Sequence, residues 1–441
     1  MNINEVYTEY PGTLPNVHEI RALDFPLFDA YNRIYLDSSA TTQEPQSVKN
    51  LMYDYRSHTL RGSNHSKNST EAREANLRFE EAREKLELFF NAKNYIVAFT
   101  GGTTDSSNWL ALRFPFEKDD LLILTCIEHN SQIVTARNMA QKMGAKIEYI
   151  PDNPTNGQID LVKLHSVISN HKKGKILLNL VHSSNVTGII NPVREIRQMM
   201  GERGFIYLDM AQTAGHCPID LDSLDVDFAG ISSHKMYGPM GIGAIFINKK
   251  SNRYIPNTVS GGSAVKLVSY WFTAYAEGHA RFEPGTQDIE GAIEWGLTID
   301  YLQKIGMVNI AAHDSSLGKL FISELMTIPK IKILGPTDIK SRNSIVTFTG
   351  KTFGTDHERI ACELDKQGIS VRDGCFCAHI YVSSQLGAPE IVHEIRTSMM
   401  KLGVFSDLML IPGAVRISFA FYNNVDEVYK TVETIRRIMT Y

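Results

Sequence analysis

The sequence contains little cysteine, no long apolar run and no strong excess of charge. Only five of its 441 residues are cysteine, and this odd, sparse count indicates reduced thiols in a cytoplasmic protein rather than a disulfide framework. No run of about 18 apolar residues is present, so we expect no membrane-spanning helix, and residues 1–20 lack the apolar core of a signal peptide. The formal net charge of -4 argues against nucleic acid or an anionic membrane as a partner.

The overall composition of the sequence is typical of a globular protein. Short apolar runs alternate with polar loops and helical segments, and this alternation predicts an α/β fold with a mostly parallel sheet covered by helices on both faces. We expect a large domain over residues 34–300 and a smaller C-terminal α+β domain over residues 301–441. Residues 1–33 are predicted to form an N-terminal arm that packs on the small domain. The clearest helical patterns cover residues 45–59, 71–90 and 289–305, and the small domain is predicted to contain strands at 345–348, 369–371 and 415–421.

A lysine lies where one of the apolar runs ends. Lys235 follows the run 226–231 and precedes a Gly-rich turn, so its amine is expected at the end of a strand. In open α/β sheets, ligands bind outside the carboxyl ends of the strands. A buried amine with a lowered pKa is what Schiff-base chemistry on pyridoxal phosphate requires. The alternative is an ordinary solvated loop lysine.

A phosphate site is predicted beside this lysine. Residues 101–104, Gly-Gly-Thr-Thr, end one strand and open a helix, whose first N–H groups and positive dipole end attract anions. The hydroxyls of Thr103 and Thr104 add donors, and Ser232 and His234 are near enough in sequence to Lys235 to reach the same phosphate. A threonine-capped helix without a ligand is the alternative.

Three further polar residues match the ring of the cofactor. Asp209 ends an apolar strand, and a carboxylate there is suited to keep a pyridine nitrogen protonated. Gln212 is a candidate hydrogen-bond partner of the ring oxygen, and His129, which follows another strand, is a candidate to stack on the ring. A capping aspartate and a hydrogen-bonded core histidine are the alternatives.

An amino-acid substrate would require a group in the site that binds its carboxylate. Arg416 lies in an apolar strand, and its planar guanidinium suits the carboxylate of an amino acid. Asn185, at another strand end, is a second candidate donor. An internal ion pair of Arg416 is the alternative.

Together, and in this order from about residue 34 to the C-terminus, these motifs resemble the class V aminotransferase-fold enzymes, which are pyridoxal-phosphate enzymes of fold type I. The resemblance is strongest to group II cysteine desulfurases and selenocysteine lyases. It rests on YLDSSATT at 35–42, GTT at 102–104, EHN at 128–130, SSNVTG at 183–188, DMAQ at 209–212, SSHKMYGP at 232–239, FEPGT at 282–286 and the segment from RIS to YN at 416–423.

The resemblance implies a homodimer with active sites at its interface. It implies that Lys235 forms the Schiff base with pyridoxal 5'-phosphate, and that Thr286 reaches the phosphate bound by the partner subunit. The other implied cofactor contacts are Thr103, Thr104, His129, Asp209, Gln212, Ser232 and His234. The implied substrate contacts are Ala40, Asn185, Arg372 and Arg416, and no metal is expected.

The loop at residues 371–378, VRDGCFCA, bears on the reaction. By resemblance, Cys377 falls on the nucleophile position of group II desulfurases, whereas Cys375 and Phe376 replace two histidines of that family. The Gly-Cys-Phe-Cys run also resembles molybdenum-cofactor sulfurases. A thiol beside an arginine is favoured as a reactive thiolate. The alternative is two inert loop cysteines.

We therefore predict an enzyme that converts L-cysteine to L-alanine and passes the sulfur to Cys377 as a persulfide, with Lys235, Cys377 and His129 as catalytic residues. Cys375 is expected to resolve the persulfide or to accept its sulfur, and a sulfur-acceptor protein is a further expected partner. The nearest alternative is a carbon–sulfur or carbon–selenium β-lyase, including a selenocysteine lyase. An amino-acid epimerase, an aminotransferase and a cofactor-binding regulatory or scaffold protein remain further alternatives.

One segment departs from the family pattern. Residues 379–413 are longer than the matching part of group II enzymes and include an apolar, partly helical stretch at 389–402. We interpret this stretch as a lid or a docking surface.

Overall fold

The computed structural model describes residues 14, 16–63, 68–257, 259–338, 341–350, 356–387, 398, 401 and 413–440. The interpretation of residues 389–402 as a lid or docking surface therefore lies outside the described residues, apart from residues 398 and 401. Most of the first 15 residues of the predicted N-terminal arm also lie outside them.

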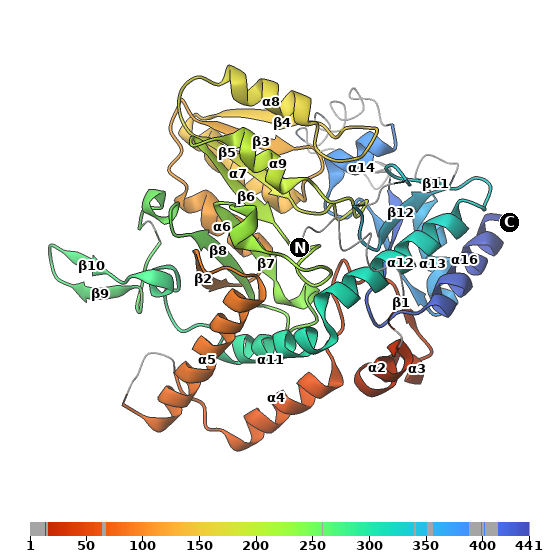
Figure 1. Ribbon diagram of the computed structural model, residues 1–441, viewed down its shortest axis with the longest axis horizontal. Helices are drawn as coiled ribbons and strands as arrows, with labels where there is room; N and C mark the ends of the chain where they lie inside the picture. Colours follow the sequence, from red (N-terminus) through yellow and green to blue (C-terminus); the bar gives the residue numbers. More distant parts are fainter. Residues whose placement is uncertain are drawn as a thin grey trace.

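A seven-stranded sheet forms the centre of the larger part of the molecule (Figure 1). Its order is β2-β8-β7-β6-β5-β3-β4, and only the two pairs that contain β8 are antiparallel. The mostly parallel sheet predicted from the alternating pattern is thus confirmed. The strands are β2 (Tyr95–Thr100), β3 (Leu121–Thr125), β4 (Lys146–Ile150), β5 (Ile176–Val181), β6 (Gly204–Asp209), β7 (Phe228–Ser232) and β8 (Gly243–Asn248).

Helices cover both faces of this sheet, which explains why its central strands are continuous apolar runs. On one face, α6 (Thr103–Arg113) and α7 (Asn130–Met143) bury residues such as Trp109 and Ile133 against the strands. On the other face, the core includes Phe79, Leu164, Ile196 and Trp295. These four residues belong to α5 (Thr70–Phe89), α8 (Leu161–Asn170), α9 (Val193–Met200) and α11 (Ile289–Ile305).

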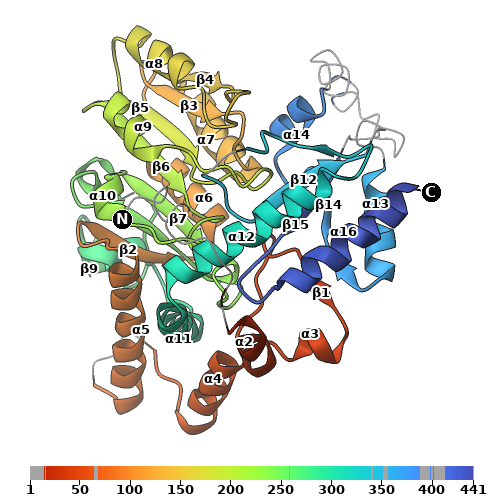
Figure 2. The same ribbon diagram turned by 45° about the vertical axis from the view of Figure 1, so that its right-hand side comes forward.

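Two consecutive helices carry the chain from the large sheet to the C-terminal part. The helix predicted at residues 289–305 is α11, and the Asp288 side chain caps it by accepting a 2.9 Å hydrogen bond from the Gly291 N–H. Gly306 then adopts a φ of 91°, which favours glycine, and α12 (Met307–Leu325) begins in a new direction. Figure 2 shows α12 running across to the C-terminal elements.

The C-terminal part contains a four-stranded antiparallel sheet of order β11-β12-β15-β14. Its strands are β11 (Lys332–Ile333), β12 (Ile345–Thr349), β14 (Arg372–Gly374) and β15 (Ala414–Ser418), and its core is shared with α12, α13 (His357–Lys366) and α16 (Val425–Thr440). The strand predicted at 415–421 ends at Ser418, because the chain then forms a turn in which the Ala420 N–H donates to the Asn423 side chain at 2.9 Å.

The N-terminal segment packs on the C-terminal elements. It contains α2 (Val17–Asp24) and α3 (Leu27–Ala30), and Arg21 forms a 2.9 Å ion pair with Glu427 of α16. The next element, β1 (Ile34–Tyr35), pairs in parallel with β13 (Ile369–Ser370), and α4 (Gln46–His58) follows. The division of the chain near residue 300 stays a prediction.

Two shorter elements lie away from these cores. A hairpin of β9 (Val265–Val268) and β10 (Thr273–Tyr275) projects from the body of the molecule (Figure 1). The short helix α14 (His379–Gln385) follows the cysteine loop. In the part of the chain that the structure describes, no helix is long and apolar enough to cross a membrane.

Candidate active site

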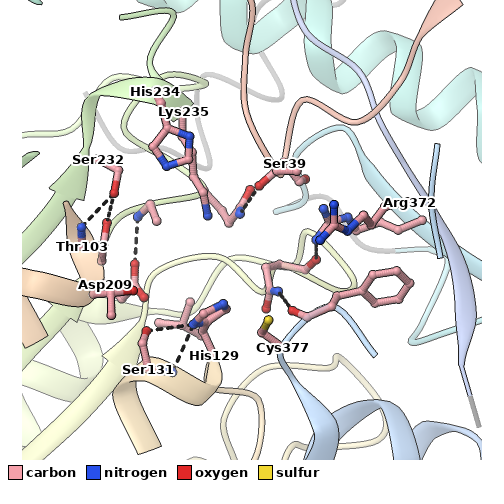
Figure 3. A pocket seen from close by; sticks show the side chains of 18 residues that line it. Ser39, Thr103, His129, Ser131, Asp209, Ser232, His234, Lys235, Arg372 and Cys377 are labelled. Carbon is pink, nitrogen blue, oxygen red and sulfur yellow. Dashed lines mark hydrogen bonds between the residues drawn. The ribbon is translucent and has the colours of Figure 1, made fainter. Parts of the chain in front are cut away.

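A cavity of about 270 Å³ opens at the carboxyl ends of β5, β6 and β7 (Figure 3). Ser39, Ser131, Val181, Ala211 and Phe376 line it beside the predicted residues. The predicted site residues that line it are Ala40, Thr103, Thr104, His129, Asn185, Asp209, Gln212, Ser232, His234, Lys235, Arg372, Cys377 and Arg416. Of the predicted set, only Thr286 does not, and it is exposed. The structure thus gathers these residues, while their individual roles stay predictions.

Lys235 ends a short 3-10 helix, Ser233–Lys235, that directly follows β7. Burial lowers the pKa of its amine, and the carboxylate of Asp209 partly opposes that effect. A lowered pKa increases the fraction of neutral amine, which is the nucleophilic and proton-accepting form.

Asp209 ends β6, and 3% of its surface is exposed. Its carboxylate accepts hydrogen bonds from the Ala211 N–H at 2.9 Å and from the Gln132 side chain at 3.1 Å. Burial raises the pKa of Asp209, whereas both hydrogen bonds and the Lys235 amine favour the ionised form. Gln132 was not predicted from the sequence. It lies in the first turn of α7, three residues after His129, and this spacing places the two side chains on the same side of the helix, which could have identified it.

The first turn of α6 and the end of β7 meet at one side of the cavity. The Ser232 hydroxyl lies 2.8 Å from both the backbone nitrogen and the side-chain oxygen of Thr103. Gly102, with a φ of 138°, precedes the helix, and a Cβ at this position would lie 3.1 Å from the Ser232 hydroxyl. The close approach of these backbone and hydroxyl groups produces a cluster of donors suited to an anion.

Two histidines beside this cluster are held neutral. Burial, followed by the Lys235 and Arg416 charges, lowers the pKa of His129 to about 4. Burial and Lys235 likewise lower the pKa of His234 to about 4. The His129 ring is also fixed in place, since its Nδ1 atom accepts a 3.2 Å hydrogen bond from the Ser131 N–H.

Some buried polar atoms of the lining residues have no hydrogen-bond partner within the described chain. They are the Oδ1 atom of Asn185, the Oε1 atom of Gln212, the Nε atom of Arg416 and the hydroxyl of Ser39. The other end of the Gln212 amide is satisfied, because it donates to the Ser39 carbonyl at 2.9 Å. Unsatisfied buried polar groups are costly, so these atoms point to a polar ligand.

The predicted cysteine loop is a tight turn with an unusual backbone. Phe376 and Cys377 have φ angles of 52° and 53°, a left-handed conformation that costs of order 1–3 kcal/mol per non-glycine residue. Three hydrogen bonds hold the carbonyl groups of the turn: Ala378 N–H to Cys375 at 2.8 Å, the Asn185 side chain to Phe376 at 2.7 Å, and Asn130 N–H to Cys377 at 2.6 Å. Figure 3 shows Cys377 facing the same space as Lys235 and His129.

The two cysteines of this turn differ in their surroundings. Cys377 is exposed and lines the cavity, whereas Cys375 is half-buried against an apolar cluster and does not line it. The structure therefore brings Cys377 alone to the cavity, and the proposed part of Cys375 in the sulfur chemistry stays a prediction.

Arg416 is buried and paired within the chain. Its Nη2 atom lies 3.1 Å from a carboxylate oxygen of Asp37, and its Nη1 atom donates to the Asn185 carbonyl at 3.1 Å. The guanidinium carbon lies 5.0 Å from the centre of the Phe376 ring. The internal ion pair considered as the alternative for Arg416 thus exists, in the same cavity as the other predicted residues.

Comparisons with known proteins agree with this geometry. A probable cysteine desulfurase of Streptomyces coelicolor is 30% identical and covers 98% of this chain and 99% of its own length. A cysteine desulfurase of Serratia proteamaculans is 33% identical, with coverages of 92% and 93%.

Two solved structures are similar to this chain over nearly its whole length. The apo structure of a cysteine desulfurase from Thermococcus onnurineus NA1 superposes with a TM-score of 0.84 at 28% identity, covering 96% of this chain and 98% of its own. The cysteine desulfurase CsdA from Escherichia coli gives 0.79 at 26% identity, with coverages of 97% and 99%. Residues 34–430 match the family "Aminotransferase class-V". The chain is therefore a member of the class-V aminotransferase family.

Proposed function

We propose that the protein is a pyridoxal-phosphate-dependent cysteine desulfurase that converts L-cysteine to L-alanine and holds the released sulfur on Cys377. The observation that carries this proposal is that the Cys377 turn and the Lys235 amine line one cavity. The relatives named cysteine desulfurase, which align over nearly the whole chain, support the same reaction.

The residues of the cavity fit the cofactor. Asp209 is a buried carboxylate suited to the pyridine nitrogen, and the free Gln212 Oε1 atom is suited to a polar group on the ring. Thr103, Ser232 and the first turn of α6 form a donor cluster suited to the phosphate. When bound, pyridoxal phosphate supplies an electron sink for charge that develops at the substrate α-carbon.

The chain's own residues then divide the remaining tasks. The Lys235 amine, neutral in part because of its burial, accepts the α-proton of the substrate and later returns a proton to the product. The neutral His129 ring lines the cavity and would lie against the cofactor ring. The Cys377 thiolate attacks the substrate sulfur atom, so an S–S bond forms as the substrate C–S bond breaks. The products are a Cys377 persulfide and, after protonation, L-alanine.

We further propose a homodimer with shared active sites, and transfer of the sulfur to an acceptor protein. Two features support the dimer. Thr286 is exposed outside the cavity, and the projecting hairpin carries Tyr270 and Trp271 with 98% and 96% of their surface exposed. Aromatic residues exposed together on a soluble domain are typical of a protein contact.

A product assay tests the proposed reaction. The purified holoenzyme is incubated with L-cysteine and a thiol reductant, and alanine, pyruvate and sulfide are quantified. We expect alanine and sulfide in equal amounts, and loss of both in Cys377→Ser. Pyruvate with ammonia would instead identify a β-lyase. In a parallel incubation with L-selenocysteine, activity on that substrate alone would identify a selenocysteine lyase.

A further inference from the structure

The helix α14 continues directly from the turn that carries Cys377. Ala378 precedes the helix, and its carbonyl accepts a 2.9 Å hydrogen bond from the Val382 N–H, so the first helical turn closes one residue after Cys377. Val382 of α14 and Leu386 after it are buried in the same apolar cluster as Phe376. A site is positioned more precisely by a helix than by a free loop. The position of the Cys377 turn therefore depends on where α14 is held.

Gln385, the last residue of α14, is bonded to two separate parts of the chain, and Figure 1 shows α14 between them. Its Nε2 atom donates to the Asp152 carboxylate at 3.1 Å, and its Oε1 atom accepts a 3.1 Å hydrogen bond from the Gly335 N–H. Asp152 follows β4 of the seven-stranded sheet, whereas Gly335 follows β11 of the C-terminal sheet. The Lys332 amine of β11 also donates to the Gln385 carbonyl at 2.8 Å. The end of α14 is thus fixed to both sheets.

Both residues to which the Gln385 side chain bonds have a fixed backbone. Asp152 forms an antiparallel bridge with Ile159. Gly335 has a φ of 75°, and a Cβ at this position would lie 2.7 Å from the Thr187 side chain, so only glycine fits there. Supporting hydrogen bonds to fixed groups are what hold a functional side chain within a narrow range of positions. The two hydrogen bonds of the Gln385 side chain are of this kind.

The position of the Cys377 turn matters at one step of the proposed reaction. Attack on the substrate sulfur requires the two sulfur atoms to lie about 3–3.5 Å apart and in line with the bond that breaks. Binding of the amino acid at the cofactor does not use the Cys377 thiol. A displacement of α14 should therefore slow sulfur transfer and leave amino-acid binding unchanged.

We propose that Gln385 is a positioning residue, which sets the place of the Cys377 thiol by tying α14 to both sheets. The inference rests on the proposed function, in which Cys377 attacks the substrate sulfur. Gln385 itself is not one of the described residues that line the cavity, so its effect on the reaction passes through α14 and the Cys377 turn.

Two measurements on the holoenzyme separate positioning from binding. The rate of alanine formation in a single turnover, with protein in excess over L-cysteine, reports sulfur transfer. A titration of the cofactor absorption band with L-alanine gives a dissociation constant. Gln385→Met removes both side-chain hydrogen bonds and keeps a helix-forming side chain of similar length. We expect the single-turnover rate to fall about fivefold or more, and the dissociation constant to change by less than about twofold.

A reversed hydrogen bond provides the rescue. Gln385→Glu places a second carboxylate against Asp152, and their repulsion should slow the single turnover at least as much as Gln385→Met does. The double variant Gln385→Glu with Asp152→Asn exchanges donor and acceptor and keeps an acceptor for the Gly335 N–H, so its rate should return to within about twofold of wild type. This pair keeps the test decisive if Gln385→Met does not fold. Ser384→Ala, at the exposed neighbour of Gln385 on α14, is the matched control and should leave the rate unchanged.

The outcomes separate this inference from the proposed function. An unchanged rate in Gln385→Met, equal losses of rate and of L-alanine binding, or a double variant as slow as Gln385→Glu would overturn the role of Gln385. If the wild-type holoenzyme formed no alanine, or if Cys377→Ser formed it at the wild-type rate, the proposed function itself would fail, whatever the Gln385 variants do.

Discussion

The side-chain amide of Asn185 donates a 2.7 Å hydrogen bond to the carbonyl oxygen of Phe376, the residue before Cys377. At the same time, the Asn185 main-chain carbonyl accepts a hydrogen bond from Arg416. One residue in the turn after β5 thus connects the cysteine turn to the arginine proposed to bind the substrate carboxylate. The turn has a strained backbone, and this contact is one of the hydrogen bonds that hold it beside the cavity.

Asn185→Ala should therefore lower the rate of sulfur transfer. A hydrogen bond of this kind contributes about 1 kcal/mol, so we expect kcat for alanine formation to fall about fivefold. Asn130→Ala is the comparison variant, because it keeps the Asn130 backbone N–H that holds the turn and removes a 2.7 Å side-chain hydrogen bond to His379 of α14. Equal losses in both variants would show that the Asn185 side chain has no special part in holding the turn.

Gln132 should affect cofactor binding through Asp209. The Gln132 amide donates to both the Asp209 carboxylate and the Ser107 hydroxyl, at 3.1 and 2.6 Å. In Gln132→Met, the ionised form of Asp209 loses one donor, so its pKa should rise and the affinity for pyridoxal phosphate should fall about tenfold. Equilibrium dialysis measures that affinity. Ser107→Ala removes the other hydrogen bond of Gln132, together with the Ser107 bonds to the Thr103 carbonyl and the Tyr207 hydroxyl, and leaves the contact between Gln132 and Asp209 intact. A loss as large as that in Gln132→Met would therefore contradict a role through Asp209.

His182 should make the protein less stable in acid. Burial lowers the pKa of His182 to about 4, whereas an unfolded histidine titrates near 6.5. Between these values only the unfolded chain binds the proton, so the free energy of unfolding falls as the pH drops from about 6.5 to about 4. Urea unfolding of wild type and His182→Asn measures this effect. As the pH drops through this range, the free energy of unfolding of the wild type should fall relative to that of the variant, and above about pH 6.5 the difference between the two should be constant.

Glu128 should have the opposite pH dependence. Burial raises the pKa of its carboxyl to about 8, while an unfolded glutamate titrates near 4.5. From about pH 4.5 to 8 only the folded chain keeps the proton, so rising pH destabilises the wild type. Glu128→Gln retains an oxygen for the Val181 N–H and Thr125 hydroxyl that donate to Glu128, and it should gain stability relative to wild type across this range. If the difference in free energy of unfolding between Glu128→Gln and wild type did not vary with pH, Glu128 would be ionised in the folded protein.

The sequence was sufficient to predict the parallel sheet and most residues of the cavity, because the relevant residues follow apolar strand-like runs. Asp209 and Lys235 are of this kind, since strand ends of a parallel sheet meet at one edge. The partner of Arg416 was not predictable in this way. Asp37 is far away in the sequence, and its position opposite Arg372 and Arg416 depends on how β14 and β15 align.

The boundary of the last predicted strand failed for a local reason. Residues 419–421 are as apolar as the strand before them, and all three are buried. They pack into the core from a turn rather than from a strand, and the Asn423 side chain fixes that turn. A run of apolar residues indicates that a segment is buried, but it does not by itself distinguish a strand from a buried turn. Here the distinction depends on recognising Asn423 as the polar residue that closes the turn.

In the proposed reaction, Cys377 receives the sulfur of L-cysteine. The most direct test is mass spectrometry of the peptide containing Cys377 after the holoenzyme reacts with one equivalent of L-cysteine in the absence of reductant. We expect one added sulfur atom on Cys377 and an equal amount of L-alanine. Consumption of L-cysteine with an unmodified Cys377 would contradict it.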